Sequence, residues 1–459
     1  MTLSSACANT LWAAAPGMVR DRVLDLVADT IAVMALGSGR PELCAVADEM
    51  RMTAPEGHAT VVGASSGWPA SLAMLINAMA VAADQLQDGH RMARGHPASH
   101  VVPAVLAVAE EHDASGAETL SAVLAGYEVG VRIGQAMGGT PPGTHDIGTW
   151  GAVAAAAGVA RLLRPGDVAA SERAIWLAAS AVLLTDAATI FEGRTGGHAF
   201  LGASVQLGAT LGISAVAGLE PLNGALDRHL RTVAAQAWSG SMLDDIDDSW
   251  GERFEVLEGY IKTHPTCAHL HGINDAVADI VGAGHPEGRR LRPADIAEVE
   301  VRTYGGAAVF NKVAEDELAA RFSVPTSIAV AIVTGRLDET TMTTQTVRSP
   351  EVRRVAELVR VVHDPALDAG YPSGRPAEVR VVLRDGVVLV ASASRPRGDA
   401  ERALTRHEIR AKASRLLRHR FGEPGAEVLT AIDGLAEGGT ARDLGEALRQ
   451  AARRHQRRT

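Results

Sequence analysis

Residues 378–390 read Glu-Val-Arg-Val-Val-Leu-Arg-Asp-Gly-Val-Val-Leu-Val, two apolar runs on either side of Asp385-Gly386. An Asp-Gly pair between such runs is typical of a tight β-hairpin turn. Earlier in the chain, residues 296–304 alternate apolar and charged side chains, as a half-buried strand does. Ser349-Pro-Glu351, between the two patterns, is typical of a helix start. We therefore expect residues 258–396 to form a small α+β domain.

The sequence on both sides of this segment has a helical pattern. Residues 8–255 are rich in alanine, and Ser115-Gly-Ala-Glu118 and Thr405-Arg-His-Glu408 are typical of helix capping boxes. We predict a mainly α fold with a large discontinuous all-helical domain and a smaller α+β lid domain. The predicted boundaries are 1–257 and 397–459 for the helical domain and 258–396 for the lid. Individual helices are expected over 23–37, 149–163, 171–184, 202–218 and 266–281.

Composition limits the classes of function. The chain has 459 residues, of which 47% are hydrophobic but only 3% aromatic, so its core must consist of small aliphatic side chains in closely packed helices. A net charge of −10 without a basic domain argues against a nucleic-acid partner. Cys7, Cys44 and Cys267 are widely spaced, as expected for reduced thiols. With no signal-peptide pattern and no uninterrupted membrane-spanning apolar run, we expect a soluble cytoplasmic protein without a membrane partner.

Three polar clusters, at residues 88–100, 143–149 and 262–271, each precede a helical pattern. Imidazole is well suited to proton transfer near neutral pH, and helix N-termini favour negative charge. We therefore expect the three clusters to form one composite site. Their histidines and lysine are His90, His96, His100, His145, Lys262, His264, His269 and His271.

The third cluster allows other interpretations. The spacing of its histidines fits no standard zinc pattern, so we expect neither a metal nor a cofactor. We interpret Cys267 as a buried small hydrophobic residue rather than a nucleophile. His271 and Asp275 are four residues apart on one helical face, so the carboxylate could orient the imidazole, although an ordinary exposed pair has the same spacing.

Motifs along nearly the whole chain resemble the MmgE/PrpD family. The likeness runs from Asn77 through Asp-Gly-His at 88–90, Gly-His-Pro at 95–97 and VVPAVLAVAEE. It continues in order through ASGAETLSAVLAGYEVGVRIG, GTHDIGTWGAVAAAAGVARLL, IKTHPTCAHLHGINDAVADI, DIAEVEVRTYG, ARFSVPTSIAVAIVTG, YPSGRP and LRDG. This family includes 2-methylcitrate dehydratase, cis-aconitate decarboxylase and iminodisuccinate epimerase. The resemblance implies a helical domain with a lid, a homodimer, and a metal-free active site between domain and lid.

The resemblance also implies roles for individual residues. His96, His145, Lys262 and His271 match the family's active-site pattern, and Asp88 and His90 match its bacterial Asp-Gly-His form. We expect proton abstraction next to a carboxylate or carbonyl of a small carboxylate substrate, in a dehydratase, decarboxylase or epimerase type of reaction. The expected acid–base groups are His96, His145, His271 and His90. The expected substrate-binding residues are Lys262, Gln85, Asp88, Arg194 and His198.

Three positions depart from the family pattern. Counted without gaps, Gln85 and Gln87 stand where acidic residues are common, and Gly197 stands where many members have a lysine or arginine. Glutamine cannot transfer a proton as a carboxylate does. We therefore expect little turnover of cis-aconitate or 2-methylcitrate, and the alternative is a binding or regulatory protein that has lost the chemistry. If Arg194 or His198 lies in the pocket, however, the cation is displaced rather than lost, and a fully acidic substrate is expected again.

Overall fold

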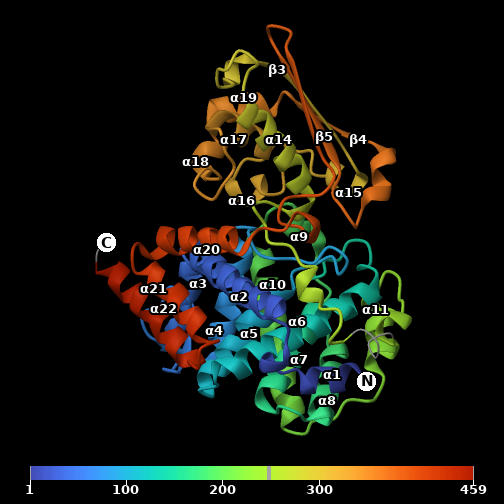
Figure 1. Cartoon of the computed structure of the whole chain (residues 1–459), viewed down its shortest axis with the longest axis vertical. Helices are drawn as coiled ribbons and strands as arrows, with labels where there is room; N and C mark the ends of the chain where they lie inside the picture. The colour runs from blue at the N-terminus through green and yellow to red at the C-terminus, as the bar shows by residue number, and fades with distance from the viewer. Residues whose placement is uncertain (1, 245–249, 458–459) are drawn as a thin grey trace.

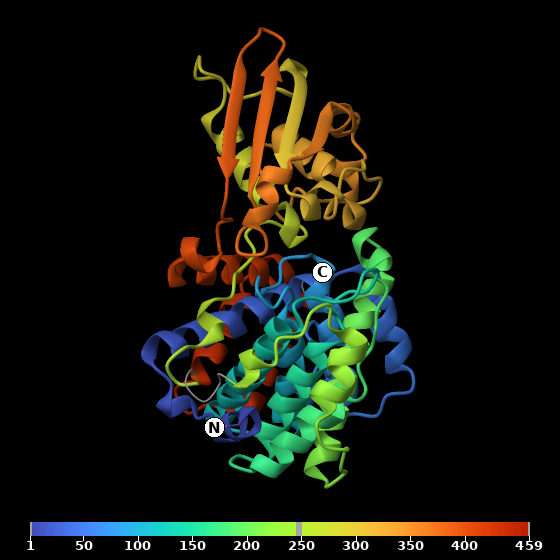
Figure 2. The ribbon, with the colours of Figure 1, turned by 90° about the vertical axis from the view of Figure 1, so that its right-hand side faces the viewer.

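The structure, a computed structural model, describes residues 2–244 and 250–457 and has two parts stacked one above the other (Figures 1 and 2). The lower part is helical and contains both ends of the described chain. The upper part combines helices with a four-stranded sheet. The predicted mainly α fold with a smaller α+β region is confirmed, whereas the domain boundaries at 257/258 and 396/397 stay a prediction.

Closely packed helices form the centre of the lower part. Helix α7 (Trp150–Leu163) packs against both α6 (Gly116–Met137) and α10 (Gly196–Val216). A Cβ at Gly208 would lie 2.3 Å from the Ala152 carbonyl oxygen, so glycine lets α10 approach α7 this closely. The other helices of this part are α1 (Leu3–Asn9), α2 (Gly17–Gly37), α3 (Pro41–Arg51), α4 (Ala70–Ala83), α5 (Pro97–Glu111), α8 (Val168–Ala179), α9 (Ala187–Phe191), α11 (Arg231–Ala234) and α12 (Ser241–Asp244), beside a short ribbon of β1 (Ala59–Thr60) and β2 (Gly67–Trp68).

Helix α10 is long and apolar enough to cross a membrane by length and composition alone, with a mean hydropathy of 1.5 over its most apolar stretch. It packs against α4, α7 and α8, however, and Gly202, Gly208 and Gly212 allow close contact with α4 and α7. The face of α10 that contacts these helices is therefore part of the helical core.

The C-terminal helices α20 (Arg406–Phe421), α21 (Gly425–Gly434) and α22 (Ala441–Gln456) return to the lower part. Helix α20 packs along α2, and two ion pairs join them: Arg410 to Asp25 at 2.7 Å and Lys412 to Asp29 at 2.8 Å. Where the chain enters and leaves the upper part, the Ile261 N–H donates to the Gly398 carbonyl at 3.1 Å. The two crossings therefore lie side by side.

The sheet of the upper part has the strand order β4-β3-β5-β6. Strand β3 (Ile296–Thr303) runs parallel to β4 (Val359–His363) and antiparallel to β5 (Ala377–Leu383), which forms a hairpin with β6 (Val388–Ala393). Gly386 has the positive φ, 90°, that the predicted Asp-Gly turn requires. Helices α14 and α17 pack against this sheet. The helices of the upper part are α14 (His271–Ala283), α15 (Gly305–Ala308), α16 (Glu317–Ala320), α17 (Val324–Thr334), α18 (Thr344–Val347) and α19 (Pro350–Ala356).

Several predicted element boundaries differ in the structure. The helix expected over 171–184 is α8, which begins earlier because Asp167 caps it, accepting from the Ala170 N–H at 2.9 Å. The helix expected over 266–281 begins only at His271, after a 3-10 turn. Ser115 caps α6 as predicted, but the Glu118 carboxylate pairs with Arg161 at 2.7 Å instead of closing the capping box. Strand β4 had not been expected from the sequence.

Candidate active site

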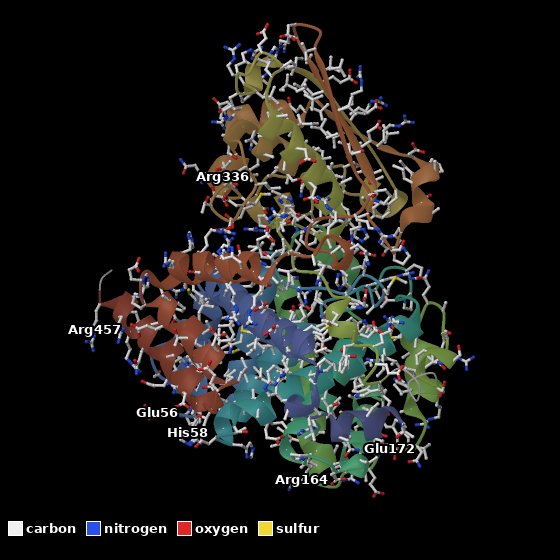
Figure 3. All side chains as sticks on the ribbon, in the orientation of Figure 1. Glu56, His58, Arg164, Glu172, Arg336 and Arg457 are labelled. Carbon is white, nitrogen blue, oxygen red and sulfur yellow. The ribbon has the colours of Figure 1, made fainter. Side chains whose placement is uncertain are left out.

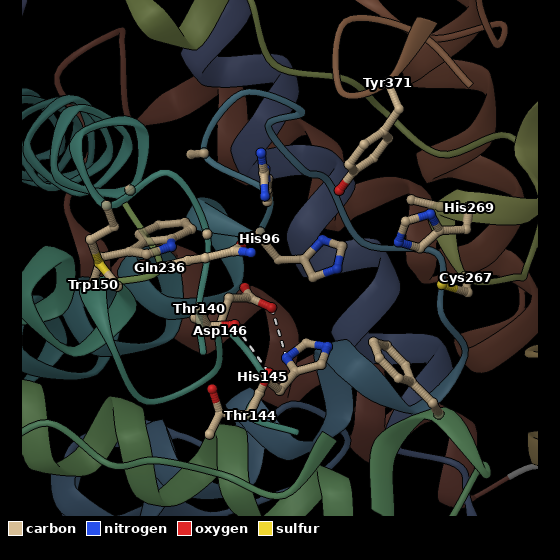
Figure 4. A pocket seen from close by; sticks show the side chains of 18 of the residues that line it. His96, Thr140, Thr144, His145, Asp146, Trp150, Gln236, Cys267, His269 and Tyr371 are labelled. Atoms are coloured by element: carbon tan, nitrogen blue, oxygen red, sulfur yellow. Dashed lines mark hydrogen bonds and ion pairs between the residues drawn. The ribbon is translucent and has the colours of Figure 1, made fainter. Parts of the chain in front are cut away.

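A cavity of about 880 Å³, including the space open to solvent, lies where the two parts meet. We call it the outer cavity; its lining includes Arg94, His96, His145 and Asp146 from the lower part and His269, Tyr371 and Arg375 from the upper part. Figure 4 shows the rings of His96, His145, His269 and Tyr371 around one open space. The three polar clusters of the sequence therefore do meet at one place, as predicted.

A smaller inner recess adjoins the outer cavity, because His96, His145, Phe191 and Cys267 line both. Its further lining includes Gln85, Gln87, Arg194, Gly197 and His198. Cys267 is buried, and burial raises the pKa of its thiol. The thiol is therefore protonated near neutral pH, in keeping with its interpretation as a small buried side chain.

His96 is held as a neutral imidazole at the entrance to α5. It occupies the N-cap position of this helix, and its Nδ1 lies 2.5 Å from the Asp88 carbonyl oxygen. Because a carbonyl only accepts, Nδ1 must carry the proton and donate, which leaves the lone pair on Nε2. Burial, followed by the positive charge of Lys262, lowers the pKa of His96 to about 3. The ring is therefore neutral at physiological pH, with the Nε2 lone pair available.

His145 forms a pair with the neighbouring Asp146. The Nδ1 of His145 lies 2.7 Å from Asp146 Oδ1 (dashed line in Figure 4), nearer than the backbone N–H of Ile147 at 3.3 Å. We therefore assign the proton to Nδ1, donating to the carboxylate. Burial by itself raises the pKa of Asp146. The neighbouring His145, His96 and His100 lower this pKa by a larger amount, so the net shift is downward.

Glycine next to His96 makes room for this pair. A Cβ at Gly95 would lie 2.2 Å from Asp146 Oδ2 and 2.4 Å from the Trp150 ring. Gly89, in the same loop, is covered by Tyr260, whose ring atoms would lie 2.2 Å from a Cβ. Backbone hydrogen bonds join Gly89 to Tyr260 in both directions, at 2.7 and 3.1 Å. The Asp-Gly-His loop is thereby fixed to the segment that carries the third cluster.

Lys262 does not reach the surface of the cavity. Its side chain is completely buried, and its Nζ donates to Gln85 Oε1 at 3.3 Å and to Gln87 Oε1 at 3.4 Å. Burial and the nearby cations Lys412 and Arg375 lower the pKa of Lys262 to about 7. The two glutamines line the inner recess in front of it. In this arrangement Lys262 acts on the recess through the glutamines rather than by direct contact.

Two other predicted residues, His90 and Asp88, lie behind the cavity. His90 accepts from the Ala93 N–H at 3.2 Å and faces Glu255 at 3.3 Å, so both of its ring nitrogens are engaged. Asp88 accepts from the Ala98 N–H at 3.2 Å at the start of α5 and holds His96 through its carbonyl, so it positions that histidine. Burial raises the pKa of the Asp88 carboxyl to about 7. Neither of these side chains is among the lining residues.

The hypothesis that Asp275 orients His271 is wrong. Asp275 lies 2.9 Å from His264 Nε2 instead, because the 3-10 turn ahead of α14 brings His264 back over the helix start. His271 is buried behind the cavity, with its Nε2 3.3 Å from the Thr266 carbonyl oxygen. Burial and the nearby His264 and Lys262 lower its pKa well below the ordinary value.

The cation expected at Gly197 is displaced. A Cβ at Gly197 would lie 3.0 Å from Ile190 Cγ1, so there is little room for a side chain there. His198 and Arg194 both line the inner recess, but burial lowers the pKa of His198, which is therefore neutral. Arg194 is exposed and also lines an outer groove. The absence of a cation at Gly197 is therefore no longer an argument against a fully acidic substrate such as cis-aconitate.

Lining residues that were not singled out from the sequence include Arg94, Asp146 and Arg375, and His269 was expected only as a member of its cluster and not as an acid–base group. His269 Nδ1 lies 2.6 Å from the Tyr304 hydroxyl, and burial together with Arg375 lowers its pKa to about 3. Asp146 and His269 lie within the quoted clusters, so adjacency to His145 and His271 could have indicated them. Within 2–244 and 250–457, no three or more ligand-type side chains gather where they could hold a metal ion.

The chain belongs to the MmgE/PrpD family. The model of the MmgE/PrpD N-terminal domain matches residues 2–220, and that of the C-terminal domain matches residues 264–437. A cis-aconitate decarboxylase of Aspergillus terreus is 24% identical over 415 residues, 84% of this chain and 82% of the relative. A cis-aconitate decarboxylase-like protein, oryM, of Aspergillus oryzae is 27% identical over 282 residues, 57% of each chain. The match thus spans little more than half of the second relative. Family and relatives support a lyase activity of the dehydratase or decarboxylase type.

Proposed function

We propose that this protein is a metal-independent lyase or isomerase that removes a proton next to a carboxylate or carbonyl of a small di- or tricarboxylate. One observation carries the proposal. His96 and His145 line the same cavity, and each has its Nδ1 engaged, one by the Asp88 carbonyl and one by Asp146. Each Nε2 is left without a hydrogen-bond partner among the residues that the structure describes, and it can therefore exchange a proton with a ligand.

The surroundings of the two rings suit proton transfer. The buried His96 is neutral and has an available lone pair, which suits a base that accepts the substrate proton. The Asp146 carboxylate accepts from His145 Nδ1, which orients the ring for proton transfer at Nε2.

Dehydration and epimerisation share this first step, whereas decarboxylation forms a comparable carbanion by loss of CO₂. In dehydration the carbanion then loses hydroxide, in epimerisation it is reprotonated on the other face, and in decarboxylation it takes up a proton at the carbon that lost CO₂. The relatives named for cis-aconitate support a tricarboxylate substrate, and Arg194 at the inner recess supplies a cation for it. We therefore include cis-aconitate among the carboxylates to be tested, although Gly197 alone had led us to expect little turnover of it.

Exchange of substrate C–H protons with deuterium from the solvent tests this function. We expect enzyme-dependent exchange into at least one small carboxylate, and a loss of about 100-fold or more when His145 is replaced by alanine. His58→Ala is the matched control, because His58 is exposed and far from the cavity (Figure 3). Carboxylate binding without any exchange would instead support the alternative of a non-catalytic family member.

We also propose that the protein is a homodimer. The end of α10 and the loop after it leave Ile213, Leu219 and Leu222 exposed by 44%, 61% and 72%. Such exposed apolar side chains favour a protein contact. Sedimentation equilibrium should give the mass of a dimer, and a Leu219→Lys, Leu222→Lys double variant should shift it toward the monomer. A monomeric wild-type protein would refute the dimer.

A further inference from the structure

Arg94 projects into the outer cavity from an unusual backbone conformation. Its φ is 56°, in the left-handed region that residues with side chains rarely adopt. The facing Gly139 leaves space for it, because a Cβ there would lie 2.6 Å from Arg94 Nη1. The guanidinium lies 5.6 Å from the centre of the Tyr371 ring. The loop therefore holds Arg94 in place at a conformational cost.

Arg375 reaches the same cavity from the upper part. Its side chain is only 6% exposed, and its guanidinium lies 5.1 Å from the centre of the Tyr260 ring. The nearest carboxylate is Asp399 at 4.0 Å, and Arg91 binds that carboxylate more closely, at 3.3 Å. Tyr371 lies close to both arginines. Its ring is under the Arg94 guanidinium, and its phenol is one of the groups that raise the pKa of Arg375.

Neither arginine has a close carboxylate partner. The Nε atoms of Arg94 and Arg375 are both buried without a hydrogen-bond partner. Arg94 makes no ion pair with any residue in 2–244 or 250–457. Burying a cation without an anion is unfavourable, and the site compensates for this cost when an anion binds.

Buried arginines elsewhere in the chain are paired. Arg321, which is fully buried, lies 2.9 Å from Asp84. Arg161 is likewise fully buried and lies 2.7 Å from Glu118. Among the described residues, Arg94 thus has no carboxylate partner, and Arg375 has only Asp399 at 4.0 Å, farther than the partners of Arg321 and Arg161.

We propose that Arg94 and Arg375 together bind a carboxylate group of the substrate in the outer cavity. Paired guanidinium groups present forked N–H donors that match the two oxygens of a carboxylate. A substrate held there would place the carbon next to that carboxylate within the cavity that His96 and His145 line. This inference rests on the proposed function and adds to it the groups that orient the substrate.

Calorimetric titration with succinate, citraconate and cis-aconitate tests the proposal without requiring turnover. We expect Arg94→Gln and Arg375→Gln each to weaken binding by about 10- to 100-fold. Arg375→Lys, which keeps the charge but not the forked donors, should lose less. Arg336→Gln, at an exposed arginine on the edge of the upper part (Figure 3), should bind as the wild type does.

Melting temperature separates a binding role from a structural one. Because neither arginine has a close carboxylate partner without ligand, the glutamine variants should melt no lower than the wild type, and succinate should no longer raise their melting temperature. Variants that bind all three acids normally, or that melt well below the wild type, would overturn the proposal, as would a wild type that binds none of the acids. Carboxylate binding through both arginines without deuterium exchange would reject only the proposed function.

Discussion

Replacing Gln85 by glutamate should restore a carboxylate next to Lys262. The Lys262 Nζ lies 3.3 Å from Gln85 Oε1, and its pKa is lowered to about 7, mainly by burial. At an effective dielectric constant of about 20, a full negative charge at this distance is worth roughly 5 kcal/mol. Desolvation of the new carboxylate offsets part of this energy, so we expect an upward shift of about 1 to 3 pKa units.

The pH dependence of kcat/KM reports this shift, because it reflects the ionisation of the free enzyme. If a charged Lys262 is needed, wild-type activity should fall as the pH rises through about 7. In Gln85→Glu the same decline should appear about 1 to 3 pH units higher. Gln345→Glu, at an exposed position on α18, should leave the profile unchanged. A folded Gln85→Glu variant with the wild-type profile would show that Lys262 does not control activity.

Three further predictions follow from particular contacts. Lys262→Met should stabilise the protein below about pH 7, by no more than about 5 kcal/mol, because the lysine is then charged in both folded and unfolded states. The gain in stability should shrink as the pH rises from the folded pKa of about 7 toward the unfolded value of 10.5. Urea unfolding near that upper pH should find little difference between variant and wild type. A gain that does not depend on pH would contradict the lowered pKa of Lys262. Asp146→Asn should lower kcat by about 100- to 10,000-fold while leaving circular dichroism unchanged, since the imidazole loses its carboxylate, and near-normal turnover would exclude the pair. Gly95→Ala should reduce both activity and melting temperature, because its Cβ would meet Asp146 and Trp150, whereas Gly143→Ala, with open space around it, should cost only the strain of its positive φ. Equal effects of the two alanines would argue against the close packing at Gly95.

The parts of the fold that were predicted correctly depend on local signals. The Asp385-Gly386 turn and the Thr405–Glu408 capping box are decided by a few adjacent residues, and both are present. Strand β4 was missed because it is short and pairs with β3 across more than fifty residues, which no local pattern shows. The end of α8 was misplaced because the apolar residues 181–184 continue the helical pattern, although they lie beyond the helix and the Leu183 N–H donates to the Gly148 carbonyl at 2.9 Å.

The site was predicted in part. His96 and His145 could be expected from their clusters and from the family resemblance, and both line the cavity. The partner of Asp275 could not be predicted, because helical spacing says nothing about the turn that brings His264 over α14. Arg375 is separated from His96 by most of the chain, and only the fold shows that the two share a cavity.

The hydrogen bond between Ile261 and Gly398 has a consequence for how this protein can be recombined. Because the chain leaves and re-enters the lower part at adjacent points, the upper part is an insertion with neighbouring ends. His96 and His145 lie outside this insertion, whereas Tyr371 and Arg375 lie within it. Grafting the upper part of another family member between residues 261 and 398 would therefore exchange Tyr371 and Arg375 and retain Arg94 and both imidazoles. Chimaeras joined at these two positions offer a direct way to transfer substrate preference between relatives.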